Sequence, residues 1–256
     1  MSVRLRGSNS IIQIRWIPKY TTVERFLHWV HTATFIPLAL TGFVLFAPWL
    51  QQLAQGQAGT TIRLIHRVAA IFFGGVPIVY AIVQPRRMWM NLREFLSFSR
   101  YDLLWLKGAF PYYVLGRHGE MPPQPRFNTG ERLTALVMVL GTIIFGLTGL
   151  PMWFLKGIMP TNLYLILVFF HDLMFIVTFV MFLIHFYLAV VHPMMWQSLV
   201  SMRYGVVSES YAREHHAAWY YGEKRAREMW EQHKAAGAHQ GRSPSNTPTT
   251  LRPGGF

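Results

Sequence analysis

Five histidines lie within strongly apolar stretches of the sequence, where an ionisable side chain is costly and is therefore a candidate for chemistry. They are His28, His31, His66, His171 and His185. His171 and His185 are 14 residues apart. On a helix they therefore lie about 21 Å apart in depth and only about 40° from the same face. One helix thus presents two imidazoles at two depths, and each depth calls for a partner from another helix.

Four apolar stretches are long enough to cross the hydrocarbon core of a bilayer as helices. They cover Phe26–Leu50, Leu64–Val83, Leu133–Leu155 and Leu163–Val191. Hydrophobic residues make up 52% of the 256 residues and charged residues only 14%, which favours a membrane protein. The sequence predicts an all-α integral membrane protein, a four-helix transmembrane bundle without a convincing internal repeat.

Positive charge is distributed unevenly around these spans. All but three of the 24 Lys and Arg residues lie in the N-terminal arm, the connection between the second and third spans, or the C-terminal tail; the exceptions are Arg63, Arg67 and Lys156. By the positive-inside rule we expect both termini in the cytoplasm. Because the charges lie beside apolar spans, the net charge of +13 indicates a membrane surface and not a nucleic-acid partner.

This orientation pairs the histidines by depth. The fourth span runs from outside to inside, so His171 lies toward the outer leaflet and His185 toward the cytoplasm. His66 opens the second span from the outer side and can face His171, while His28 opens the first span from the inner side and can face His185. Two imidazoles at one depth suit a b-type haem, whose flat apolar ring fits between the helices of a bundle.

Several residues leave alternatives open. His31 lies one turn from His28 and competes with it for the inner pair, and His192 at the end of the fourth span is a further alternative. Asp172 is the one acid well inside a span; it either accepts a hydrogen bond from a ligand imidazole or lines a polar mouth. The chain has no cysteine, which excludes iron–sulfur clusters and covalently attached haem on this chain, so a metal here must rely on histidine.

The chain divides into four parts. We expect a cytoplasmic N-terminal arm at 1–25, a membrane domain at 26–191 with a cytoplasmic loop at 84–132, a cytoplasmic helical tail at 192–236, and a disordered tail at 237–256. In the loop, Asn91–Lys107 alternates apolar and charged residues, which fits either a helix on the membrane surface or an ordinary packed loop helix. After Gly237 the chain is rich in Gly, Ser, Pro and Thr, which is typical of disorder.

Four groups of residues form a pattern that composition does not explain. They are Arg25-Phe26-Leu27-His28-Trp29 with Thr41-Gly42, then Phe127-Asn128-Thr129-Gly130-Glu131, then His171 with His185, and finally the tail from Val207 through His215-His216 to Trp219-Tyr220. Together they resemble the cytochrome b (gamma) subunit of membrane-bound respiratory formate dehydrogenases. The resemblance runs from about Tyr20 to Glu231.

The resemblance implies two haem sites that agree with the pairing by depth. The outer haem would be held by His66 and His171, and the inner haem by His28 and His185. It also implies a quinone pocket beside the inner haem, in which His185 is shared between iron and quinone.

Asn128 and Gly130 would lie at the edge of that pocket. Glu131 stands where the family commonly has Gln, and Asp172 stands where small residues are expected. A carboxylate at Glu131 either relays a proton or is a surface acid at the start of a helix, where the helix dipole favours it.

In this family a molybdenum or tungsten (alpha) subunit oxidises formate outside the membrane, and an iron–sulfur (beta) subunit delivers the electrons to the cytochrome. We therefore expect the quinone-reducing electron-transfer subunit of an oxidoreductase complex in the bacterial inner membrane, a complex that can assemble further. The alternatives are the cytochrome b of a nickel–iron hydrogenase or of a sulfur-compound reductase. From other classes, a haem-free histidine-dependent transporter or a passive membrane anchor would also place histidines in spans.

Overall fold

The computed structural model describes residues 2–4, 11–116 and 121–240. In that part of the chain, four helices are long and apolar enough to cross a membrane. They are α1 (Thr22–Phe46), α2 (Gly56–Val83), α5 (Thr129–Phe154) and α6 (Thr161–Phe186), the last continued by the π-helical turn η2 (Tyr187–Val191). Each overlaps one predicted span, so the all-α membrane class is confirmed.

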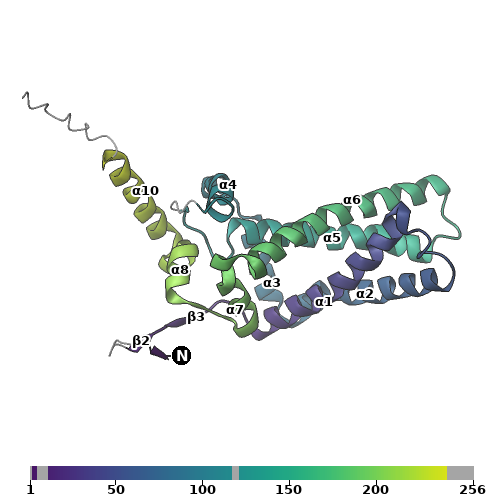
Figure 1. Cartoon of the computed structure of the whole chain (residues 1–256), viewed down its shortest axis with the longest axis horizontal. Coiled ribbons are helices and arrows are strands. Elements are labelled where there is room, and N and C mark those ends of the chain that lie inside the picture. Colours follow the sequence, from purple (N-terminus) through teal and green to yellow (C-terminus); the bar gives the residue numbers. More distant parts are fainter. Residues whose placement is uncertain (1, 5–10, 117–120, 241–256) are drawn as a thin grey trace, which may run out of the picture.

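The four helices form two antiparallel hairpins, α1 with α2 and α5 with α6, which lie side by side (Figure 1). The short connections after α1, which include η1 (Pro48–Leu50), and after α5 lie together at one end of the bundle, called the loop end here. Large apolar side chains cover the outer faces; Leu40, Ile82 and Leu147 are each more than 60% exposed. Such a surface is favourable only against lipid.

All four spans begin earlier than predicted because their first turns are polar. Thr21 caps α1 and Asn128 caps α5, and in each case the acid three residues on, Glu24 or Glu131, accepts a hydrogen bond from the backbone N–H of the capping residue. These capping boxes stabilise a helix start without apolar residues. The helix α2 likewise begins at Gly56 and not at Leu64.

The connection between α2 and α5 contains two helices, α3 (Pro85–Leu96) and α4 (Arg100–Tyr113). The prediction of one helix over Asn91–Lys107 is therefore wrong. The break has a local cause: the Ser99 side chain accepts from the backbone N–H of Tyr101, and Asp102 accepts from Ser99 N–H, which starts a new helix.

The N-terminal arm and the C-terminal segment meet at the other end of the bundle. Strand β3 (Trp16–Pro18) pairs antiparallel with β4 (Val206–Ser208), and the backbone N–H groups of Lys19 and Tyr20 donate to Gly205 O. Residues 15–24, 84–116, 121–132 and 192–222 form this end, called the polar end here. A further hairpin joins β1 (Ser2–Arg4) to β2 (Ile11–Gln13).

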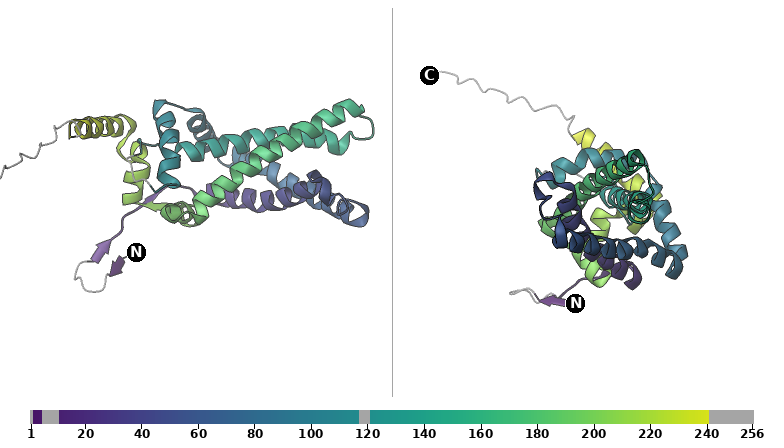
Figure 2. Two further views of the ribbon diagram at one scale, coloured as in Figure 1. Left: turned by 45° about the horizontal axis from the view of Figure 1, so that its top comes forward. Right: turned by 90° about the vertical axis from the view of Figure 1, so that its right-hand side faces the viewer.

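The C-terminal segment covers the polar end with short helices. They are η3 (Pro193–Met195), α7 (Trp196–Tyr204), α8 (Glu209–His215), α9 (Ala217–Tyr221) and α10 (Glu223–Gln240). Helix α10 projects away from the bundle, as both side views show (Figures 1 and 2). It extends past the predicted boundary at 236, so residues 237–240 are helical, and the rest of the predicted disordered tail lies outside the described residues.

Candidate functional site

The four histidines predicted as ligands form two facing pairs inside the bundle. The ring centroids of His66 on α2 and His171 on α6 are 6.4 Å apart. Those of His28 on α1 and His185 on α6 are also 6.4 Å apart. The first pair lies toward the loop end and the second toward the polar end, so α6 contributes one ring to each pair, as its 14-residue spacing predicts.

This separation fits one metal ion between the two rings of each pair. Two metal–nitrogen bonds of about 2.0 Å, with an offset of roughly 1.1 Å between each nitrogen and its ring centroid, place the centroids about 6.2 Å apart. In the described part of the chain, no three His, Cys, Asp or Glu side chains converge to hold a metal ion by themselves. Each pair therefore suits a metal that brings its own equatorial ligands, as haem iron does.

The hydrogen bonds of His66 show which ring nitrogen keeps its lone pair. Thr41 Oγ1 donates its only hydrogen to Pro37 O at 2.6 Å, so it accepts at 2.8 Å from His66 Nδ1. Nδ1 must therefore carry the hydrogen. His66 Nε2 keeps its lone pair and is the nitrogen available to a metal.

The His171 ring is held in the same way. Thr148 Oγ1 donates to Ile144 O at 2.7 Å and accepts from His171 Nδ1 at 2.8 Å. Thr148, and not Asp172, is thus the hydrogen-bond partner that orients this imidazole. Sequence reasoning missed Thr148, although Leu-Thr-Gly occurs at 40–42 and again at 147–149.

The glycine after each threonine gives the ring its space. A Cβ on Gly42 would lie 3.5 Å from His66 Cε1, and one on Gly149 would lie 3.4 Å from His171 Cε1. The two hairpins therefore repeat one local design, in which a Thr-Gly pair on the first helix supports a histidine on the second. The sequence separations, 25 residues from Thr41 to His66 and 23 from Thr148 to His171, are similar.

The inner pair is arranged differently. The Nδ1 atoms of His28 and His31 are buried without a hydrogen-bond partner within the described residues. The His31 ring stacks on Phe73 with 4.0 Å between centroids, whereas His28 faces His185. His192, the further alternative, donates from Nε2 to Tyr113 O at 2.8 Å at the polar end.

Aromatic side chains fill the bundle between the two pairs. Phe35 and Phe73 are at most 5% exposed, and the Phe35 ring lies 4.8 Å from that of Phe182. Phe145 reaches the outer pair, with its ring 4.9 Å from that of His171. Close-packed aromatic side chains thus occupy the space between the two histidine pairs, and close packing of this kind leaves little room for water.

Asn128 and Gly130, predicted at a quinone pocket, lie at the start of α5. Asn128 is buried and its Oδ1 accepts from Glu131 N–H at 2.9 Å, so the side chain caps the helix. A Cβ on Gly130 would lie 2.9 Å from Trp105 Cη2, so only glycine fits there without a shift. Both residues lie at the polar end, which is also the end nearer to the pair formed by His28 and His185.

Glu131 belongs to a buried cluster that its position in the sequence did not indicate. Lys19 Nζ donates to Glu131 Oε1 at 3.1 Å and to His216 Nε2 at 3.0 Å. His216 Nδ1 donates to Pro125 O at 2.8 Å. Burial, and next the nearby Lys19 charge, lower the pKa of His216 to about 3. Glu131 does lie in the first turn of α5, but the interpretation of it as a surface acid is wrong, since its carboxylate is paired with the buried Lys19.

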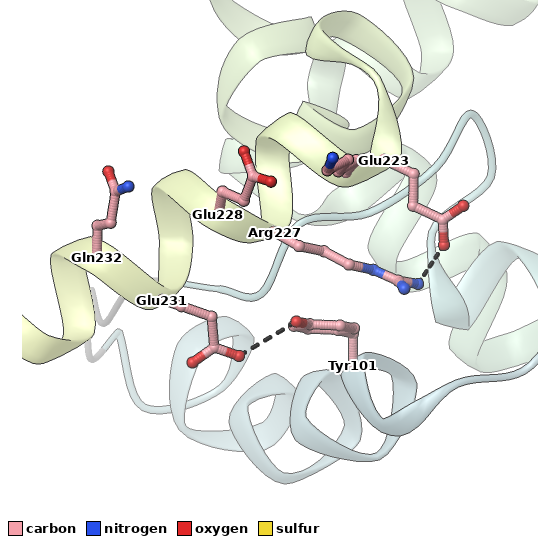
Figure 3. A pocket seen from close by; sticks show the side chains of 7 residues that line it. Tyr101, Glu223, Arg227, Glu228, Glu231 and Gln232 are labelled. Carbon is pink, nitrogen blue, oxygen red and sulfur yellow. Dashed lines mark hydrogen bonds and ion pairs between the residues drawn. The ribbon is translucent and has the colours of Figure 1, made fainter.

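A large hollow of about 690 Å³ lies elsewhere, between α4 and α10 (Figure 3). Tyr101 and Glu231 form a hydrogen bond across it, and Arg227 pairs with Glu223 along α10. The histidine pairs do not line this hollow. Its charged walls give it no resemblance to the apolar interior in which the paired histidines lie.

Two helix hairpins with histidine pairs at two depths define a membrane-bound cytochrome b. Residues 19–205 match the model of the family described as prokaryotic cytochrome b561, and the chain belongs to that family. Membership implies b-type haem, the cofactor that the paired histidines fit.

Formate dehydrogenase cytochrome subunits are among the similar proteins. The cytochrome b556(fdo) subunit of Escherichia coli (strain K12) is 24% identical over 80% of this chain and 92% of its own length. The cytochrome b556 subunit of Haemophilus influenzae is 23% identical over 80% and 82%, respectively. The nitrate-inducible cytochrome b556(Fdn) subunit of Escherichia coli is 24% identical over 77% and 87%. The predicted resemblance to this group of cytochromes is confirmed.

Proposed function

We propose that the chain is the dihaem cytochrome b subunit of a formate dehydrogenase complex and carries electrons across the membrane to quinone. His66 and His171 would hold the iron of the outer haem, and His28 and His185 would hold that of the inner haem. The observation that carries this proposal is the pair of equal 6.4 Å ring separations at opposite ends of one bundle. A transporter or a passive anchor gives no reason for two such pairs.

Different residues of the chain have different roles in the proposed electron transfer. Haem supplies a carrier that accepts and releases single electrons. The threonines behind His66 and His171 hold these rings in one tautomer, and the aromatic interior around Phe35 keeps water out of the electron path. Quinone binds at the polar end, beside His185 and near Asn128 and Gly130.

The orientation of the chain in the membrane follows from the distribution of its positively charged residues. The polar end carries the arm, the loop and the tail that hold most of the Lys and Arg residues, so it faces the cytoplasm and both termini are cytoplasmic. The chain lies in the bacterial inner membrane. Electrons then enter near the loop end and leave near the polar end, where quinone takes its protons from the cytoplasm.

The electrons come from another polypeptide. This chain has no cysteine and so has no thiolate ligands for an iron–sulfur cluster. Its relatives are named as subunits of formate dehydrogenases. An iron–sulfur beta subunit and a molybdenum or tungsten alpha subunit are therefore the partners, and the complex can form a higher oligomer.

The test uses the purified complex and reduced-minus-oxidised spectra. We expect b-type bands that are reduced by formate and reoxidised by a quinone analogue. His66→Met should alter one band and His28→Met the other, whereas His31→Met should leave iron coordination intact. Absence of b-type bands in protein from haem-replete cells would refute the proposal. Reduction by hydrogen and not by formate would indicate a hydrogenase cytochrome instead.

A further inference from the structure

The two ligands of the outer pair share a feature that His28 of the inner pair lacks. Both His66 Nδ1 and His171 Nδ1 donate to a threonine hydroxyl at 2.8 Å. His28 Nδ1 is buried with no acceptor within the described residues. The chain therefore treats its two proposed haem sites differently at the second nitrogen of the ligand ring.

The direction in which each threonine hydroxyl donates its hydrogen is determined by the helix that carries the threonine. Thr41 donates to Pro37 O and Thr148 donates to Ile144 O, each four residues earlier. A hydroxyl has one hydrogen, so each oxygen is left to act as an acceptor toward the histidine. Both threonines are buried, with exposed fractions of 8% and 5%, so water does not compete for these contacts.

An acceptor on Nδ1–H makes an imidazole ligand more electron-rich, because it draws the hydrogen away from the ring. An electron-rich ligand stabilises the oxidised metal more than the reduced metal, so the reduction potential falls. In the dry interior of the bundle these hydrogen bonds act at low dielectric, where their effect on charge is larger than in water.

We propose that Thr41 and Thr148 are positioning residues that selectively lower the reduction potential of the outer haem. The inference rests on the proposed function, which assigns His66 and His171 as its ligands. The consequence is a potential difference directed inward. Electrons that enter at the outer site are thereby favoured to move toward the pair formed by His28 and His185.

The experiment is a potentiometric titration of the b-type bands in the purified protein. Thr41→Val and Thr148→Val remove the acceptor and should each raise the midpoint potential of one haem, the one altered by His66→Met, with a larger rise in the double variant. Thr148→Ser keeps a hydroxyl and should leave the potential near its original value. Thr148→Ala removes the acceptor with less crowding and serves if the valine variant binds haem poorly.

Thr142→Val is the matched control. Its hydroxyl donates to Met138 O at 2.8 Å on the same helix, and among the described residues it forms no hydrogen bond to a histidine. Both midpoint potentials should stay unchanged in this variant. Charged groups near the outer pair, such as Arg67, are the same in every variant, so they do not affect the comparison.

The outcomes separate this inference from the proposed function. Two haems per chain with unmoved potentials in the Thr41 and Thr148 variants would overturn the inference and leave the proposed function standing. Equal shifts of both haems would also overturn it, because the effect would then not be local. If the unaltered chain binds no haem, the proposed function itself fails.

Discussion

Lys19 is the residue whose removal should most clearly expose the energetics of the polar end. Its side chain is 1% exposed, and its ammonium group contacts both Glu131 Oε1 and His216 Nε2. Burial lowers the pKa of Lys19, while the neighbouring Glu131 carboxylate counteracts part of that shift. Lys19→Met keeps much of the apolar stem but removes the charge and the hydrogen bonds.

The expected loss of stability depends on the charge that is left unpaired after the substitution. Removing one partner of a buried ion pair costs about 3–5 kcal/mol, because the other charge is left unpaired. The Glu131 side chain is 22% exposed and still accepts from Asn128 N–H, so solvent and the helix start compensate for part of the loss. We therefore expect Lys19→Met to destabilise the protein by about 2–3 kcal/mol, at or just below the lower limit of that range.

A double-mutant cycle makes the prediction specific. Glu131→Gln alone leaves the Lys19 ammonium buried without its counter-charge and should cost about 3 kcal/mol. In the double variant no charge is stranded, so the combined cost should be smaller than the sum by about 2 kcal/mol. Lys224→Met, at an exposed position on α10, should change stability by less than about 0.5 kcal/mol.

The assay is thermal unfolding in detergent, followed by intrinsic tryptophan fluorescence, because the chain has no cysteine for thiol-reactive dyes. A loss of 2–3 kcal/mol corresponds to a fall in Tm of roughly 4–12 °C for a chain of this size. Additive effects of the two single variants would refute the reasoning, since they would mean that Lys19 and Glu131 do not depend on each other.

Further predictions concern helix packing, pH and the cap of α5. Gly141→Ala places a Cβ 2.7 Å from Thr178 Cγ2, so α5 and α6 must shift and stability should fall by about 1–3 kcal/mol; Gly146→Ala, with nothing within 4 Å, should be neutral in the same thermal assay. The pKa of His216 falls from 6.5 to about 3 on folding, so the unfolded chain binds more protons between these values. The contribution of His216 to stability should therefore be fully present above pH 6.5 and decrease by up to about 1.4 kcal/mol per pH unit below it. His216→Asn should flatten the measured dependence of Tm on pH, and an unchanged slope would contradict the assignment of this pH dependence to His216. Asn128→Ala removes the cap of α5 and should cost about 1 kcal/mol in the same assay; no loss would show that the cap is dispensable.

The membrane architecture could be predicted because it depends on apolar length alone. A stretch of about 20 apolar residues indicates a span whatever its neighbours are. The facing of His171 and His185 toward separate partners also follows from helix geometry, since rise and rotation per residue are constant. The structure brings together the same two pairs that depth matching predicts.

Other features depend on contacts that a linear pattern does not record. The acceptor role of Thr148 requires α5 and α6 to be rotated toward each other, and nothing at Thr148 itself indicates that rotation. Lys19 and His216 are 197 residues apart and meet only because the arm and the tail pair as strands. The break before α4 was missed because the apolar periodicity of the loop outweighed the capping signal at Ser99.

The central claim is that this single chain holds two b-type haems, each between two histidines. Haem content per polypeptide, measured as the pyridine haemochrome on purified protein of known concentration, tests it most directly. We expect two haem b per chain, falling to one in the His66→Met with His171→Met double variant. A value of one or none in the unaltered chain would contradict the claim.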